Sequence, residues 1–450
     1  MKANGRTLLS NSTWSLLNQG ARVGALALVT IALSRHFGPQ RFGALAFGLA
    51  FVRIFAVIAA FGLDRILVRY FVETDGGSGA TVRSAFFLKL AIAFVSYLAL
   101  IALVFVVDPR DRLTFSIVLI AGGGLLFQAF DVFDFFFQAQ NRFRLVFFGR
   151  TLPIVFSTAL KLGAIVLGAP LLVYAALETV ETSLIALALF VVYLRSRPAP
   201  APRTAVSAVA PQHLLREGLP LLLGSLAAMI YMRSDVLMLG KMISFRAAGI
   251  YSAASQVTEA CALLPMAFVP ALFPVLLRWR KFGAEYYSRQ FEKLFLGAAL
   301  TGTAIAASLT VAAPLVAHLL YGPEYASAAK ILMIHGWSAI FLYVAIMQTG
   351  YDITERLTWW TAIRTAAGAT VNVILNFILI PRYGASGSAV ATLLSLSCSG
   401  FLFNAVHPLT RPIFWMQLRA FLLVPLVRPL LVPAAPDQSP QLANPGSVAR

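Results

Sequence analysis

The stretch WSLLNQGARVGALALVTIALSRHFG, residues 14–38, is an apolar run long enough to cross a lipid bilayer, yet it carries an arginine near its middle. A guanidinium group at the centre of a membrane-spanning helix costs roughly 3 kcal/mol on insertion scales. We therefore expect the charge of Arg22 to be met by water, by another part of the protein or by a ligand. The remainder of the chain must supply that environment.

Composition assigns the chain to the integral membrane proteins. Of its 450 residues, 59% are hydrophobic and only 12% are charged, and the mean hydropathy is +0.80. A soluble protein of this length would carry about 25% charged residues. The net charge of +18 comes mostly from short loops, so we attribute it to membrane topology and not to nucleic-acid binding. The two cysteines, Cys261 and Cys398, lie in apolar runs and imply neither a disulfide framework nor a metal centre.

Apolar segments long enough to span the bilayer recur along the chain. We predict about twelve transmembrane helices, and hence an all-α membrane protein, at residues 14–35, 41–63, 84–107, 113–137, 145–168, 170–194, 217–240, 247–276, 293–318, 327–350, 358–380 and 385–407.

A Pro- and Ala-rich linker, RSRPAPAPRTAVSAVAPQ (195–212), divides these helices into two sets of six. The halves are weakly similar, because PQRFGALAFGLAFVRI (39–54) resembles SFRAAGIYSAASQVTE (244–259), with Gly43 falling on Gly249. We predict six-helix bundles at 1–194 and 214–408, joined by a cytoplasmic linker at 195–213 and related by a pseudo-two-fold axis along the membrane normal. Residues 409–450 are expected to form an amphipathic or interfacial segment and a disordered tail. Within them, the stretch 412–432 could also be a poor additional span.

Lys and Arg residues are more frequent in the connections that face the cytoplasm if the N-terminus lies inside. We therefore expect both termini to be cytoplasmic. The expected location is the inner membrane of a bacterium.

Basic residues inside the predicted helices are candidates for substrate binding. Counted at 1.5 Å per residue, Arg22 and Arg53 come out near the same depth, close to the membrane midplane. Like charges do not neutralise each other, so together they favour an anion. Adding Arg233 and Arg364 from the second half predicts a cationic cavity between the halves, suited to a phosphate or pyrophosphate head group. Lys89 lies close to a helix end, where it should reach the inner surface.

Other buried charges suggest ion pairs. Lys161 and Glu178 match in depth, with Glu181 one turn deeper, and Asp134 or Asp131 lies level with Arg150. The alternatives of structural ion pairing and of coupling to protons or sodium stay open for one set: Asp134, Lys161, Glu178, Glu181 and Glu259.

The predicted helix at 358–380 has a polar face formed by residues spaced four apart. Arg364, Gly368, Asn372 and Asn376 follow this spacing, so the face must point inward. Asn372 and Asn376 are expected to bind neighbouring helices by hydrogen bonds.

Several motifs resemble a known family. NVILNFILIPRYGASGSAVATLLS (372–395) resembles the helix 11–12 junction of polysaccharide flippases, with paired Asn, Ile-Pro, Gly-x-x-Gly and Ala-x-Ala-Thr. Further pieces occur in the family's order: LSRHFGPQRFG (33–43), DVLMLGKMISFRAAGIYSAA (235–254), FVPALFPVLLR (268–278) and LLYGPEYASAAKIL (319–332). The chain therefore resembles the polysaccharide-transport branch of the multidrug/oligosaccharidyl-lipid/polysaccharide exporter superfamily.

This resemblance implies a MATE-like fold of two six-helix bundles around a central cavity. It implies a transporter that flips undecaprenyl-pyrophosphate-linked oligosaccharides across the inner membrane, for O-antigen, lipopolysaccharide, capsule or exopolysaccharide synthesis. The implied partners are that lipid-linked oligosaccharide, the bilayer, and a polysaccharide polymerase with chain-length proteins. No cofactor is implied, although proton or sodium coupling would fit.

Two other functions were weighed. A multidrug exporter of the same fold should carry unpaired acids for cationic drugs, whereas the first helix carries Arg22. A membrane-bound polymerase or ligase would need a large outer loop with catalytic groups, and every predicted outer loop is short. The five histidines are scattered and suggest no catalytic cluster: His36, His213, His318, His335 and His407. We therefore do not expect an enzyme.

Overall fold

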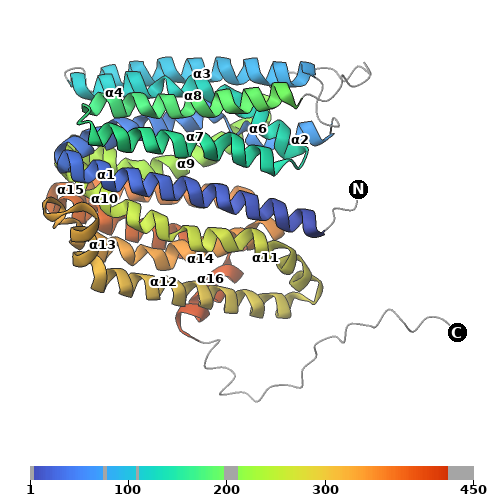
Figure 1. The fold of residues 1–450 in the computed structure, drawn as a ribbon. Helices are drawn as coiled ribbons and strands as arrows, with labels where there is room; N and C mark the ends of the chain where they lie inside the picture. The colour runs from blue at the N-terminus through green and yellow to red at the C-terminus, as the bar shows by residue number, and fades with distance from the viewer. Residues whose placement is uncertain (1–4, 74–78, 108–110, 197–210, 424–450) are drawn as a thin grey trace.

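The computed structural model describes residues 5–73, 79–107, 111–196 and 211–423, and in these ranges it contains helices and no strand (Figure 1). The first half holds α1 (Gly5–Ala60), α2 (Leu63–Glu73), α3 (Gly79–Val107), α4 (Arg112–Gly122), α5 (Gly124–Phe127), η1 (Gln128–Phe130), α6 (Asp131–Ala139), α7 (Phe143–Val166) and α8 (Leu171–Arg195). The second half holds α9 (Pro211–Met242), α10 (Phe245–Cys261), α11 (Leu263–Lys281), α12 (Ala284–Tyr321), η2 (Pro323–Tyr325), α13 (Ala328–Gly336), α14 (Ser338–Thr354), α15 (Thr358–Gly400), η3 (Leu402–Ala405) and α16 (Arg411–Phe421).

Two of these helices are each two arms separated by a glycine. The φ angle is 67° at Gly38 in α1 and 58° at Gly384 in α15, values that residues with a Cβ rarely adopt. The chain of α15 reverses direction at Gly384, so that its two arms lie side by side. The Asn372 amide nitrogen in the first arm lies 3.3 Å from the Ser395 hydroxyl and 3.5 Å from the Thr392 hydroxyl in the second. In α1, residues of both arms line one cavity, among them Val29, Leu33 and Phe42. Figure 1 shows the α1 turn at the end of the molecule opposite the N-terminus, called here the Gly38 end.

Length and hydropathy identify eight described helical stretches able to cross a membrane, or nine if the bent pair α13 and α14 is one span. The stretches Gly20–Glu73 and Trp359–Ala405 each contain both arms of a turned helix. Each of the twelve predicted segments therefore falls on a helix, on one arm, or on a run of short helices. The segment predicted at 113–137, for example, is α4, α5, η1 and α6 in succession.

The outward surface of the bundle is apolar. Val311 on α12 is 84% exposed, Val106 on α3 is 75% exposed, and Leu152 on α7 is 61% exposed. Soluble proteins rarely leave such surfaces uncovered, whereas lipid tails cover them without cost. The chain is a multi-pass membrane protein.

The two halves touch most closely where α1 crosses α10. A Cβ added to Gly43 would lie 1.7 Å from the Phe245 carbonyl oxygen, and one added to Gly249 would lie 2.1 Å from that of Pro39. Near this crossing, the Tyr325 hydroxyl donates to the Ser34 carbonyl at 3.2 Å. The backbones therefore approach as only glycines allow, as in other membrane helix pairs. This contact closes the Gly38 end between the halves.

The halves also meet toward the opposite end, where α2 packs on α9. Gly218 lies against Phe61, and Arg69 of α2 forms an ion pair with Glu217 of α9. The Tyr70 hydroxyl lies 2.9 Å from His213 Nδ1. Contacts on both sides thus enclose a space near the middle of the molecule.

Two predictions fall partly outside the described residues. Of the predicted linker at 195–213, residues 197–210 are not described, and α9 already begins at Pro211. Of the segment 412–432, only α16 and the next two residues are described. Eleven residues are too few to cross a bilayer. Arg419 of α16 binds Glu292 of α12 at 2.8 Å, so α16 packs on the bundle.

The glycine crossing yields a stability prediction. We expect Gly43→Ala to lower the melting temperature of the purified protein in detergent, because overpacking costs about 1–3 kcal/mol. Gly24→Ala is the matched control in the same helix, since a Cβ at Gly24 meets nothing within 4 Å. Equal melting temperatures for the two variants would contradict the close crossing.

Candidate functional site

A polar cavity of about 60 Å³ lies between the two halves. Both arms of α1 line it, together with α7, α8, α9 and α10. Its charged lining consists of Arg53, Lys161, Glu178, Arg233 and Glu259. Such a volume holds a few water molecules and is far smaller than the several hundred Å³ of a typical ligand pocket. A large substrate could therefore enter only after the halves move apart.

Arg53 is the cavity cation without a protein partner. Neither a hydrogen bond nor an ion pair reaches it from any residue that the structure describes. Four charged side chains act on the Arg53 guanidinium. Arg233 and Arg22 repel it, whereas Glu178 and Glu259 attract it. An unpaired guanidinium in a small cavity favours an anion from outside the protein.

Arg22 lies one helical turn from the cavity-lining Leu26. Its side chain is exposed and repels Arg53. It forms no ion pair within the described ranges. One turn earlier, Asn18 accepts a hydrogen bond from Thr151 of α7 at 3.1 Å. The polar side of this arm therefore faces α7, and Arg22 adds positive potential beside the cavity.

The other two cavity cations have acidic partners. Lys161 donates to Glu178 at 2.7 Å and to Glu181 at 2.8 Å, so the ion pair expected from matched depths is present. Arg233 contacts Glu259 with both terminal nitrogens, at 3.3 and 3.4 Å. The predicted pairing of Arg150 also occurs, with Asp131 at 2.7 Å and with Asp134.

Arg364 does not line the cavity between the halves, contrary to the prediction. Its side chain is buried and binds Asp352 at 3.2 Å and the Gln348 carbonyl oxygen at 2.6 Å, both on α14. Gln417 of α16 reaches the same Gln348 oxygen at 2.9 Å. Asp352 lies twelve residues earlier in the chain, at the end of α14.

Lys89 also differs from its prediction. Its side chain is 1% exposed and does not reach a surface. The ammonium nitrogen lies 3.9 Å from the Asp64 carboxylate and 5.0 Å from the centre of the Phe135 ring. Asp64 of α2, which follows the break at Gly62, and Phe135 of α6 thus lie beside Lys89, so a position expected at a helix end is a buried one.

Asn372 and Asn376 join helices, as the polar face predicts. Asn372 accepts from Ser234 of α9 at 2.9 Å, and Asn376 donates to Asp235. Asp235 also accepts from Tyr251 and from Thr392, the latter at 2.8 Å. These bonds tie α9, α10 and both arms of α15 together.

Asp235 is the residue that sequence reasoning missed as a coupling candidate. In the described parts of the chain it is the one buried carboxylate that no Lys or Arg pairs. Its donors are neutral, and the Asn376 carbonyl oxygen beside it is buried without a partner. Arg233, two residues earlier in the chain, lines the cavity and binds Glu259.

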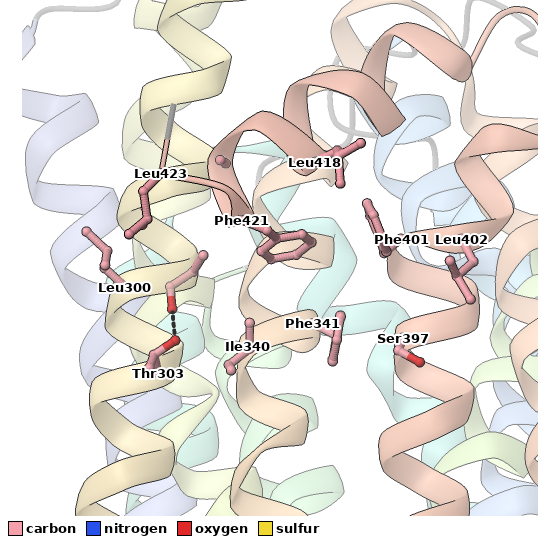
Figure 2. Close-up of a pocket in the computed structure, with 12 residues that line it drawn as sticks. Leu300, Thr303, Ile340, Phe341, Ser397, Phe401, Leu402, Leu418, Phe421 and Leu423 are labelled. Carbon is pink, nitrogen blue, oxygen red and sulfur yellow. Dashed lines mark hydrogen bonds between the residues drawn. The ribbon is translucent and has the colours of Figure 1, made fainter. Parts of the chain in front are cut away.

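A larger cavity, of about 510 Å³, lies between α12, α14, α15 and α16 (Figure 2). Figure 2 shows Phe341, Phe401 and Phe421 around it, with Leu300 and Leu423 to one side. Its two hydroxyls are satisfied by their own helices, Thr303 on the Ala299 carbonyl and Ser397 on that of Leu394. It carries no charged group and offers nothing that would bind a phosphate.

Comparison with known proteins assigns the family. Residues 8–279 match the family described as "Polysaccharide biosynthesis protein". The chain belongs to this family. It is 26% identical to the probable flippase AglR of Haloferax volcanii over 391 residues, which cover 84% of this chain and 78% of that protein. It is 34% identical to the succinoglycan biosynthesis transport protein ExoT of Rhizobium meliloti over 98 residues, or 22% of this chain and 19% of ExoT.

Solved structures confirm the fold class. An inward closed conformation of the lipid II flippase MurJ superposes with a TM-score of 0.65 at 14% identity, covering 94% of each chain. An inward-facing multidrug resistance MATE family transporter of the MOP superfamily gives 0.64 at 14% identity, covering 92% of this chain and 95% of that one. The predicted all-α, MATE-like architecture is therefore correct, and the chain is a flippase-like transporter of the polysaccharide biosynthesis family.

The environment of Arg364 yields a second prediction. We expect Arg364→Met to destabilise the protein by about 3–5 kcal/mol, because it leaves Asp352 charged and buried without its partner. The double variant Arg364→Met/Asp352→Leu should recover part of the lost melting temperature in detergent. If Arg364→Met has the melting temperature of the native protein but no longer transports, the structural role is contradicted and a role of Arg364 in substrate binding is supported.

Proposed function

We propose that this protein flips an undecaprenyl-pyrophosphate-linked oligosaccharide across the cytoplasmic membrane by alternating access. The observation that carries the proposal is the unpartnered Arg53 in the cavity between the halves, with Arg22 and Arg233 beside it. A pyrophosphate brings negative charge that such a group of guanidinium ions can bind through several hydrogen bonds. The named relatives AglR and ExoT support a lipid-linked or polymeric sugar as the cargo class.

In the proposed cycle, the head group occupies the cavity and the polyprenyl chain stays in the bilayer. The Gly43–Gly249 crossing closes the Gly38 end while the other end admits the head group. Separation of α1 from α10 then opens the Gly38 end. The cations offset the loss of water from the head group in the enclosed state.

The proposal includes the location and topology of the chain. The protein lies in the inner membrane of a bacterium with both termini in the cytoplasm, so that the Gly38 end faces outward. Its units are the bundles 1–194 and 214–408 with the linker 195–213 between them, and a polymerase with chain-length proteins uses the exported unit. O-antigen, lipopolysaccharide, capsule and exopolysaccharide synthesis are the processes that such a transporter serves.

A multidrug exporter fits the cavity less well. Drug cations need free carboxylates, but Glu178 is bound to Lys161 and Glu259 to Arg233. The similarity to MATE transporters lies below 25% identity and concerns the fold.

Removal of the unpartnered cation tests the function. We expect Arg53→Ala to reduce polysaccharide export by at least tenfold in cells that depend on this protein, at an equal amount of protein in the membrane. Arg382→Ala, at the exposed turn of α15, is the control and should leave export unchanged. Normal export by Arg53→Ala would refute the cationic site.

Asp235 is the proposed site of ion coupling. A proton or a sodium ion would bind at the unpaired carboxylate, which accepts hydrogen bonds from the Asn376 amide nitrogen and the Thr392 hydroxyl. Binding there would change the hydrogen bonds that join α9, α10 and α15. The acids expected earlier as alternatives, Asp134, Glu178, Glu181 and Glu259, all contact a cation or its partner.

Coupling is tested in proteoliposomes. We expect transport by the native protein to respond to an imposed proton or sodium gradient, and Asp235→Asn to abolish that response while the protein stays folded. Asp111→Asn serves as the control, because Asp111 caps the exposed start of α4 and Asn caps equally well. Retention of the gradient response by Asp235→Asn would exclude this site.

A further inference from the structure

The two halves place opposite charges at matching positions beside the cavity. Gly43 and Gly249 are the residues in closest contact where α1 crosses α10. Ten residues after each glycine, the chain has Arg53 in the first half and Glu259 in the second. Both side chains line the cavity. The site that we propose for an anionic head group therefore contains an anion of its own.

Glu259 is the most loosely bound of the cavity acids. Its two contacts with Arg233 measure 3.3 and 3.4 Å, whereas Lys161 holds Glu178 at 2.7 Å. Charge-assisted hydrogen bonds of full strength measure about 2.7–2.9 Å. The Arg233 Nε nitrogen is buried without a hydrogen-bond partner, so the guanidinium is incompletely satisfied. About a third of the Glu259 side chain is exposed, against 14% for Arg233.

The surroundings let Glu259 exchange one cation for another. The positive charge of Arg53 attracts the Glu259 carboxylate, and both side chains line the cavity. Arg53 itself has no hydrogen bond or ion pair with any described residue. Further charged or titratable groups near this pair are Glu178 and Lys161 on α8 and α7, Arg22 on α1, and His335 on α13. Released from Arg233, the carboxylate would still face positive charge.

We propose that Glu259 is an internal counter-ion that competes with the substrate's phosphates for Arg233. This inference rests on the proposed function, since it assumes that a pyrophosphate enters the cavity. Without substrate, Glu259 neutralises Arg233. With substrate, a phosphate oxygen takes the Arg233 nitrogens and Glu259 turns toward Arg53. The competition lowers the affinity of the cavity for its cargo, and a transporter gains from this because a tightly held substrate is not released.

The opposite role would be that of a positioning residue. If Glu259 only holds Arg233 in place for the substrate, its removal weakens binding. The two roles therefore predict changes of opposite sign in the affinity for a pyrophosphate.

The test uses the purified full-length protein in detergent and farnesyl pyrophosphate as the probe, with calorimetry as the measurement. We expect Glu259→Gln to bind the probe at least tenfold more tightly than the native protein does. Glu259→Asp shortens the side chain by one methylene, which lengthens a contact with Arg233 that is already long, and it should tighten binding to an intermediate degree. In Glu259→Gln/Arg233→Ala the gain should disappear, because the cation for which Glu259 and the phosphates compete is gone. Glu285→Gln, an exposed acid on α12, controls for the change in net charge and should not alter the affinity.

The outcomes separate this inference from the function on which it rests. If Arg53→Ala weakens binding but Glu259→Gln leaves it unchanged or weaker, the internal counter-ion is refuted and the cationic site stands. If Glu259→Gln does not fold, Glu259→Asp replaces it in the test. Tighter binding of the probe by Glu259→Asp supports the internal counter-ion, and unchanged or weaker binding refutes it. If Arg53→Ala binds the probe as the native protein does, the proposed function itself fails. Binding of inorganic pyrophosphate as tight as that of the probe would show that the head group alone is recognised, which supports the competition at Arg233.

Discussion

A guanidinium or ammonium group inside the hydrocarbon layer must be met by an acid, by polar groups or by water. Much of this structure follows from which group neutralises or hydrogen-bonds each buried cation. Arg150, Lys161 and Arg364 find carboxylates on a neighbouring helix of their own half, and those pairs hold the bundles together. Arg233 has a long contact with Glu259. Arg53 has no described partner and lies at the cavity between the halves.

The buried pairs occur at corresponding places in the two halves. Arg150 follows the break between α6 and α7 and binds acids on α6, while Arg364 follows the break between α14 and α15 and binds an acid on α14. Each pair ties the fourth helical segment of its half to the fifth. This agrees with the weak repeat around Gly43 and Gly249. The halves differ at the cavity, where Arg53 of the first half and Glu259 of the second both line the wall.

Depth counting along single helices predicted some contacts well and others badly. It found the Lys161–Glu178 pair because consecutive antiparallel helices pack side by side, so equal depth means proximity. It failed for Arg364, whose partner Asp352 lies near the end of α14, beyond the predicted segment 327–350. It failed for Lys89 because the continuation of α2 past Gly62 was not foreseen. It also passed over Asp235, whose sequence neighbour Arg233 faces a different direction on the helix.

The sequence by itself determined that this is a multi-pass α-helical membrane protein and where its apolar segments lie, and it predicted basic residues inside those segments. These properties depend on hydropathy and charge along the chain, which are local. Only the tertiary structure decided which cations are neutralised, because an ion pair depends on the rotation of each helix about its axis and on which helices are neighbours. A rotation of half a turn exchanges a cavity-facing residue for one facing lipid without changing its depth. For that reason the sequence could place basic residues inside the apolar segments. It could not show that Arg53 lines the cavity without a described partner, together with Glu259.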